Sequence, residues 1–182
     1  MSVFTNTASR SVEQARAYTA AILDLLGTRE PLPVLRETPD AVRRIVAAVS
    51  EAHLSQPEAP GKWSMRHVVV HLSDGDLVWG YRLRMVLAQD RPALTGYDQD
   101  LWADRLRYDE APIAQTLDEF TVLRRSNLRL VSGASAADLE RVGVHSERGE
   151  ESVAHMISMY AGHDLLHLAQ LERIRRAVLA HA

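Results

Sequence analysis

A pair of histidines near the end of the sequence has the spacing of metal ligands. His163 and His167 are four residues apart, and on an α-helix this spacing places both rings on one face. Each neutral imidazole offers one ring nitrogen, so the pair can bind one divalent metal ion. The alternative is that both are ordinary core or surface histidines. Asp164 stands where a zinc protease has its catalytic glutamate, so protease chemistry is not indicated.

A third histidine, His71, lies on an earlier predicted helix. It falls within an apolar stripe that runs from Val68 to Val86, and a ring that faces the core needs partners for its nitrogens. If the two helices are neighbours in a bundle, His71, His163 and His167 can converge on one metal. Three ligands leave a position open for water, as in catalytic zinc sites. A metal in such a site lowers the pKa of water to about 7 and polarises a carbonyl group.

Two aspartates lie close to these histidines in the sequence. Asp74, three residues after His71, is a candidate either to orient a ligand histidine or to act as a base toward an activated water. An equally good interpretation is a helix-surface carboxylate paired with an arginine. Asp164 points about 100° away from His163 around the helix, and we expect it on the surface.

The other histidines are weaker candidates. His67 forms a second pair with His71, which makes a site of four histidines conceivable, but we expect His67 at the rim of the site or in solvent. His155 is displaced from His163 by about 80° around the helix. His145 lies in a link between helices and could approach the mouth of the site. The remaining two are expected to be exposed or terminal: His53 and His181.

Five amphipathic segments must position these residues. Apolar side chains recur in them at spacings of three and four, and capping residues mark where they begin. The predicted helices cover residues 12–26, 38–52, 64–90 and 112–133, and the last begins after its cap Ser152. Thr38 is expected to cap the second helix, with Pro39 in its first turn, and Ser64 to cap the third. Residues 30–33, with two prolines, are expected to form a short rigid connector.

The connections between these helices contain no alternating pattern long enough for a strand. Residues 92–109 form a long connection with few helical features, residues 135–139 a capped turn, and residues 142–151 an extended or turning link. Long ordered connections often cover functional sites. The sequence therefore predicts an all-α fold: a bundle of four main helices with additional short helices and a long crossover loop.

Composition limits the classes of function. The 182 residues suit a single domain, residues 1–182, and the formal net charge of −3 argues against binding to a nucleic-acid backbone. With no cysteine, a metal must be held by histidine, aspartate, glutamate or water. No apolar run approaches the roughly 18 residues that a membrane span needs. No signal peptide is visible, so we expect a cytoplasmic location. Nucleophile-elbow, phosphate-loop and dinucleotide motifs are also missing.

Several segments together resemble one known family. These are GKWS (61–64), HLSD (71–74), GYDQDLW (96–102), GVHSERG (143–149) and GHDLLHLAQ (162–170). They are similar to segments of the DinB/YfiT-like family, and the resemblance extends over about residues 35–178. The combination is far more specific than any single motif.

The resemblance implies a four-helix bundle of up-down-down-up topology. It also implies a divalent metal, zinc or nickel, on three histidines that correspond here to His71, His163 and His167, the same three that the apolar stripes select. Members are often dimers, so a homodimer is expected. Members are described as metal-dependent hydrolases, and relatives with the same bundle are thiol-dependent transferases or isomerases.

Three hypotheses of function follow. The first is a metal-dependent hydrolase of a small molecule, in which Asp74 orients or deprotonates an activated water. The second is an S-transferase or isomerase that uses a low-molecular-weight thiol from outside the protein, with Arg66, Arg82 and Arg84 as candidates to bind its carboxylates. The third is a non-catalytic, metal-binding stress protein, which would have a closed, dry centre without a pocket.

Overall fold

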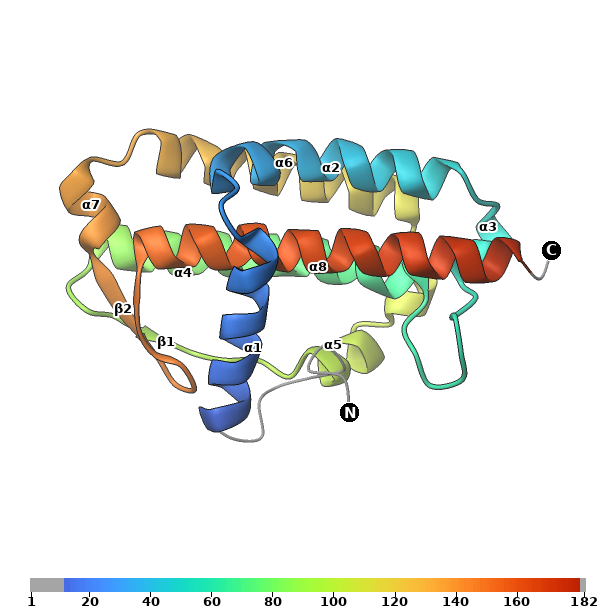
Figure 1. The fold of residues 1–182 in the computed structure, drawn as a ribbon, viewed down its shortest axis with the longest axis horizontal. Coiled ribbons are helices and arrows are strands. Elements are labelled where there is room, and N and C mark those ends of the chain that lie inside the picture. Colours follow the sequence, from blue (N-terminus) through green and yellow to red (C-terminus); the bar gives the residue numbers. More distant parts are fainter. Residues whose placement is uncertain (1–11, 181–182) are drawn as a thin grey trace.

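Four long helices form the framework of the protein (Figure 1). The computed structural model describes residues 12–180. The four helices are α2 (Pro31–Ala47), α4 (Met65–Ala88), α6 (Ile113–Ser132) and α8 (Val153–Leu179). α2 and α8 run in one direction and α4 and α6 in the other (Figure 1). The fold is therefore the expected up-down-down-up bundle.

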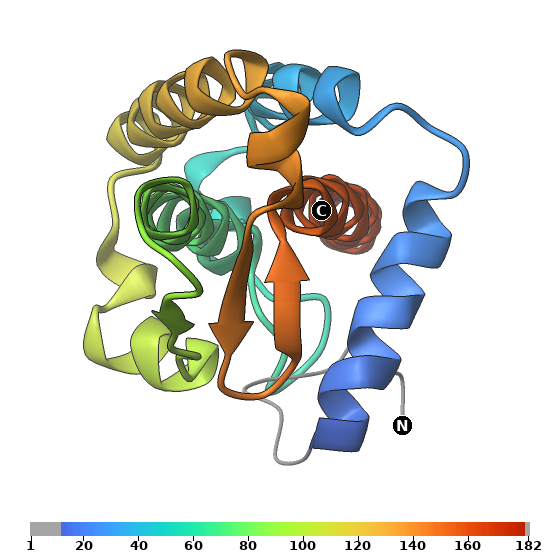
Figure 2. The same cartoon turned by 90° about the vertical axis from the view of Figure 1, so that its left-hand side faces the viewer.

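α4 and α8 lie side by side in the middle of the molecule (Figure 2). α2 and α6 cover one side of this pair. The other side faces α1 (Val12–Leu26), a small sheet and α5 (Gln99–Arg105). Because α4 and α8 are covered on two sides, each buries residues over most of its circumference.

Hydroxyl caps fix the starts of the two central helices, as the sequence predicts. The Ser64 hydroxyl accepts a hydrogen bond from the His67 backbone N–H, and Ser152 accepts one from the His155 N–H. Each bond satisfies one of the four N–H groups that have no acceptor within a helix. These serines therefore define where the two helices that carry the three histidines begin.

The chain contains a small sheet that we did not expect. Strand β1 (Ala93–Leu94) pairs in parallel with β2 (Val142–His145), and β2 pairs antiparallel with β3 (Gly149–Ser152). Leu94 is in register with His145. Strands of two and four residues are too short to produce an alternating pattern, and β1 and β2 are remote in sequence. The link 142–151 is therefore extended and ordered, whereas the link 92–109 is extended only where β1 lies.

Short helices occupy the other connections. They are α3 (Glu51–Leu54), α5, the 3₁₀ turn η1 (Tyr108–Glu110) and α7 (Ala136–Glu140), which Ser135 caps as predicted. α4 and α6 run in parallel, so the chain between them must return along the bundle. This return contains β1, α5 and η1, and it is the predicted long crossover.

The predicted boundaries of the second helix were wrong. α2 begins at Pro31, not after Thr38, and ends at Ala47. Pro31 costs no hydrogen bond, because the first N–H groups of a helix have no acceptor within it. Pro39 is inside the helix and leaves the Leu35 carbonyl without its usual donor. The Arg124 guanidinium of α6 donates to that carbonyl at 2.6 Å instead.

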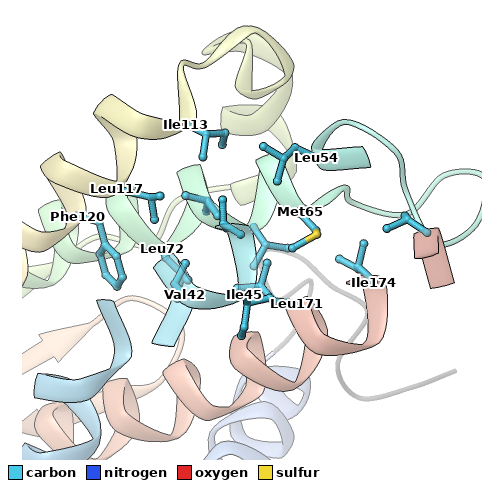
Figure 3. Packing of buried hydrophobic residues seen from close by; sticks show 14 residues of the cluster. Val42, Ile45, Leu54, Met65, Leu72, Ile113, Leu117, Phe120, Leu171 and Ile174 are labelled. Atoms are coloured by element: carbon cyan, nitrogen blue, oxygen red, sulfur yellow. The ribbon is translucent and has the colours of Figure 1, made fainter. Parts of the chain in front are cut away.

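Two apolar clusters flank a polar middle. The first draws on α2, α4, α6 and α8 and includes Leu72, Phe120 and Leu171 (Figure 3). The second surrounds Trp79 and includes Ala161 of α8. Between the clusters, both central helices bury polar residues: Ser73 and Asp76 on α4, and Asp164 and His167 on α8. Within residues 12–180, no helix combines the length and the apolar character that a membrane span requires.

A glycine sets the distance between α1 and α8. A Cβ atom at Gly162 would lie 2.1 Å from the Ile22 carbonyl oxygen. We expect Gly162→Ala to lower the free energy of unfolding by more than about 1 kcal/mol, because overpacking outweighs the helix propensity of alanine. Urea denaturation measures this.

Gly133→Ala is the matched control. A Cβ there would lie 3.6 Å from its nearest neighbour, the Arg129 carbonyl oxygen, which is an ordinary contact. Equal stabilities of the two variants would contradict the close approach of α1 to α8.

Candidate metal centre

The structure brings together the three histidines that the sequence singles out. His71 extends from α4, and His163 and His167 extend from α8. The Nε2 atom of His163 lies 3.1 Å from Nε2 of His71 and 3.1 Å from Nε2 of His167. The three potential ligand atoms all lie within 4.8 Å of one another. Three imidazole nitrogens therefore face one point between the two central helices.

This arrangement fits a divalent metal ion. Nitrogen ligands about 2.0–2.1 Å from a tetrahedral zinc ion lie roughly 3.3 Å apart, close to the two separations of 3.1 Å found here. A neutral imidazole has one N–H donor and one acceptor nitrogen. A cation between three Nε2 atoms would satisfy all three lone pairs at once, and imidazole nitrogens suit several divalent transition metals.

Burial keeps the three rings neutral. Desolvation is the largest cause of the lowered pKa values of His71 and His163, and the neighbouring histidines lower them further. Burial lowers the pKa of His167 to about 4, against the effect of its hydrogen bond to Gln170. Neutral imidazole is the form that binds a metal. The site is therefore in its ligating form at pH 7.

The Gln170 side chain selects the ligating nitrogen of His167. Nδ1 of His167 donates to the Gln170 Oε1 atom at 2.8 Å, which leaves the Nε2 lone pair free for a metal. Nδ1 of His71 and Nδ1 of His163 are buried and have no hydrogen-bond partner among the described residues. The Trp63 ring packs on His71, with 5.1 Å between the ring centroids.

Asp74 lies near the site but contacts a different residue. It is half-buried on α4 and accepts a hydrogen bond from the Tyr108 hydroxyl. Burial raises the pKa of the Asp74 carboxyl, against the hydrogen bond from Tyr108. Asp74 makes no bond to the His71 ring, whose Nδ1 atom lacks a partner within the described residues.

The expectation that Asp164 lies on the surface was wrong. Asp164 is fully buried and pairs with Arg124, whose Nη1 atom lies 2.5 Å from Oδ2. Arg124 also pairs with Asp76, with 2.7 Å between Nη2 and Oδ2. Asp164 is rotated by about 100° from His163 around the helix axis. On a helix that packs against the core with only one side, this rotation would place the side chain in solvent. On α8 it leads to the layer that contains α2 and α6.

The remaining histidines occupy different places. His67 is partly exposed, and its Nδ1 atom lies 2.8 Å from the Ser64 hydroxyl. His155 lies in the first turn of α8 and His53 on α3, both partly exposed. His145 is buried at the end of β2 and lines a cavity. His181 is outside the described residues.

A cavity of about 120 Å³ opens beside His71 and His163. Its walls come from α1, α4, α8, the crossover after β1 and the β2–β3 hairpin. Sequence reasoning did not assign several of its residues: Tyr18, Tyr97, Arg148, Met159 and Tyr160. The available signals were weak, namely the inward stripe of α1 and the two connecting segments 96–102 and 143–149.

Fold and site together define a class: helical bundles with a three-histidine metal site between two helices. Residues 35–171 match the sequence model of the DinB superfamily. The chain belongs to that superfamily.

Named relatives agree with this assignment. A protein of Oceanobacillus iheyensis named "Putative metal-dependent hydrolase" is 28% identical over 137 residues, which cover 75% of this chain and 79% of its own. A Bacillus mycoides protein with the same designation is 26% identical over 141 residues, covering 78% of this chain and 81% of its own.

A solved structure shares the fold. YfiT from Bacillus subtilis, described as a probable metal-dependent hydrolase with an unusual four-helix bundle topology, matches with a TM-score of 0.76 and 22% identity. The match covers 80% of this chain and 84% of that one. At this identity the likeness establishes the fold alone.

The Gln170 bond to His167 provides a test of metal affinity. We expect Gln170→Ala to weaken zinc binding by about 10- to 100-fold, because Nδ1 of His167 loses the acceptor that orients its ring. Competition with a chromophoric chelator measures the affinity.

Gln170→Glu keeps an acceptor at this position and should retain wild-type affinity or exceed it. Gln115→Ala is the control, since Gln115 bonds to Glu119 on the exposed face of α6. If Gln170→Ala bound zinc as tightly as Gln115→Ala, the orienting role would be refuted.

Buried histidines make the stability of the metal-free protein depend on pH. The pKa values of His145 and His167 are lowered to about 4 by burial, so below pH 6.5 the unfolded chain binds more protons than the folded one. Stability should therefore fall as the pH falls from 6.5 to 5. Each such histidine contributes up to about 1.4 kcal/mol per pH unit.

Urea denaturation of the chelated protein at pH 7, 6 and 5 measures this slope. His145→Gln removes one of these buried histidines without touching the three-histidine cluster, so it should flatten the slope. An unchanged slope in His145→Gln would show that the ring is not held neutral by the fold.

Proposed function

We propose that the chain is a metal-dependent hydrolase of a small molecule, with zinc or nickel held by His71, His163 and His167. One observation carries the proposal: three neutral imidazoles converge at the edge of a cavity. The names of the relatives support a metal-dependent hydrolase at the coarser level. We also propose a homodimer, on family resemblance alone, and a cytoplasmic location.

The residues of the chain have distinct tasks in this proposal. A divalent metal, when bound, supplies Lewis acidity toward a carbonyl group and lowers the pKa of water. The three histidines hold it on rigid helices, and Gln170 orients one of them. Asp74 is our candidate for the proton acceptor, because its pKa is raised by burial and the Tyr108 hydroxyl holds its carboxylate in place.

A thiol-dependent transferase is the second candidate. This hypothesis requires an arginine in the pocket to bind the carboxylates of the thiol. Of the three arginines considered, Arg82 lines the cavity. Arg66 instead bonds to Glu51 and to the Ala111 carbonyl, and Arg84 bonds to the Ser126 hydroxyl. The third candidate, a non-catalytic protein, is disfavoured because a cavity adjoins the histidines.

Metal content is the first test of the proposal. We expect about one zinc or nickel per chain in the wild type, and less than about a tenth of that in His71→Ala, His163→Ala and His167→Ala, because two imidazoles bind far more weakly than three. Elemental mass spectrometry measures the metal, and circular dichroism checks folding.

His67→Ala is the control variant, since His67 lies one turn before His71 and contacts the Ser64 cap. The metal-loaded protein is then assayed on carboxylic esters and amides, and Asp74→Asn should keep its metal and lose about 100-fold in kcat. A wild type that takes up neither zinc nor nickel would refute the metalloenzyme proposal.

A further inference from the structure

We infer that the cavity beside the three histidines binds a small organic monoanion, whose carboxylate pairs with Arg82 and accepts a hydrogen bond from His145. This assigns a substrate class to the proposed hydrolase site and therefore rests on the proposed function.

Arg82 carries a buried positive charge and forms no ion pair among the described residues. It lies on α4, is 5% exposed and lines the cavity. Its Nη2 atom donates to the Thr95 carbonyl at 2.5 Å. A guanidinium has five N–H donors in a planar fork that matches a carboxylate. Arg82 therefore has further N–H donors available for a bound carboxylate.

The other charges of the cavity wall leave this one uncompensated. Arg148 pairs with the buried Glu151, with 3.0 Å between Nη2 and Oε2. Arg82 also lowers the pKa of this carboxyl, so two buried guanidinium groups share one buried carboxylate and one positive charge remains. Glu147 also lines the cavity, but it is partly exposed, so water screens its charge more than that of Arg82. A single unmatched positive charge suits a monoanion, whereas a phosphate dianion would leave one negative charge uncompensated in the cavity.

His145 supplies an unpaired donor in the same wall. Its ring is 2% exposed, and its Nδ1 atom accepts a hydrogen bond from the Glu147 backbone N–H at 3.1 Å. The proton of the neutral ring is therefore on Nε2, which has no partner among the described residues. Burial and the nearby Arg148 and Arg82 lower the pKa of His145 to about 4. A buried donor without an acceptor is costly, and a bound carboxylate would satisfy it.

The spacing on α4 places the anion away from the metal. Arg82 follows His71 by eleven residues, which is about 16 Å along the helix axis, and its side chain tilts back toward the helix N-terminus. Gly75 lies between them and lines the cavity. A substrate would thus have its carboxylate at one end and its reacting group at the other. The Tyr18, Tyr97 and Tyr160 rings line the same cavity.

Binding of N-acetylglycine and its neutral counterpart N-acetylglycinamide tests the inference. Both are titrated into metal-free and zinc-loaded wild type by calorimetry at constant ionic strength. We expect the acid to bind at least about tenfold more tightly than the amide in both forms, because only the acid can pair with Arg82. Equal affinities, or tighter binding of inorganic phosphate than of the acid, would overturn the inference.

Variants locate the anion. Arg82→Gln should lose the preference for the acid, and Arg82→Lys should keep part of it because the charge remains. Arg84→Gln is the matched control, since Arg84 carries the same charge on the same helix but does not line the cavity. His145→Gln should weaken acid binding by about threefold. Retention of the full preference in Arg82→Gln would also overturn the inference.

The test separates the two proposals. Zinc uptake without a preference for the acid would refute the substrate class and leave the metal site intact. A preference for the acid in a protein that binds no metal would support the anion pocket and refute the hydrolase. If Arg82→Gln does not fold, the comparison of acid and amide in the wild type decides.

Discussion

The buried Arg124 guanidinium links the four helices of the bundle at one point. It extends from α6 and bonds to the Leu35 carbonyl of α2, to Asp76 of α4 and to Asp164 of α8. Placing such charges in a core costs desolvation energy that well-packed apolar side chains would avoid. Each carboxylate is held by two nitrogens of one planar group, so the network favours one rotation of each helix over its neighbours.

This rotation is also the one that brings the three histidines together. Asp164 directly follows His163, and Asp76 follows Gly75, which lies against the His163 ring. The ion network joins α4 and α8 to α2 and α6. His71 and His163 line the cavity, whose other walls come from α1, the crossover and the hairpin. These elements lie on the opposite side of α4 and α8 from α2 and α6 (Figure 2). A slip of one residue would rotate a helix by about 100°. Such a slip would break the ion pairs and, at the same time, move the Nε2 atoms of the three histidines apart.

The sequence predicted the three histidines better than it predicted the buried ion pairs and helix boundaries around them. Spacing and apolar stripes on single helices are local patterns, so they identified His71, His163 and His167. They do not reveal how many sides of a helix are covered, which is why Asp164 was misplaced. The start of α2 was missed for a similar reason: Pro39 is tolerated because Arg124, remote in sequence, bonds to the carbonyl that it leaves free.

The division of the site between helices and connections explains which of its properties a sequence can reveal. The three histidines lie on rigid helices with serine caps, which is where a metal site is held most accurately. Much of the cavity wall comes from α1, the crossover and the hairpin, and β1 and β2 pair across remote segments. The connections can change without moving α4 or α8, so one metal site can serve different substrates. Arg82 extends from α4 itself, so the anion contact that we infer would lie on the same helix as His71.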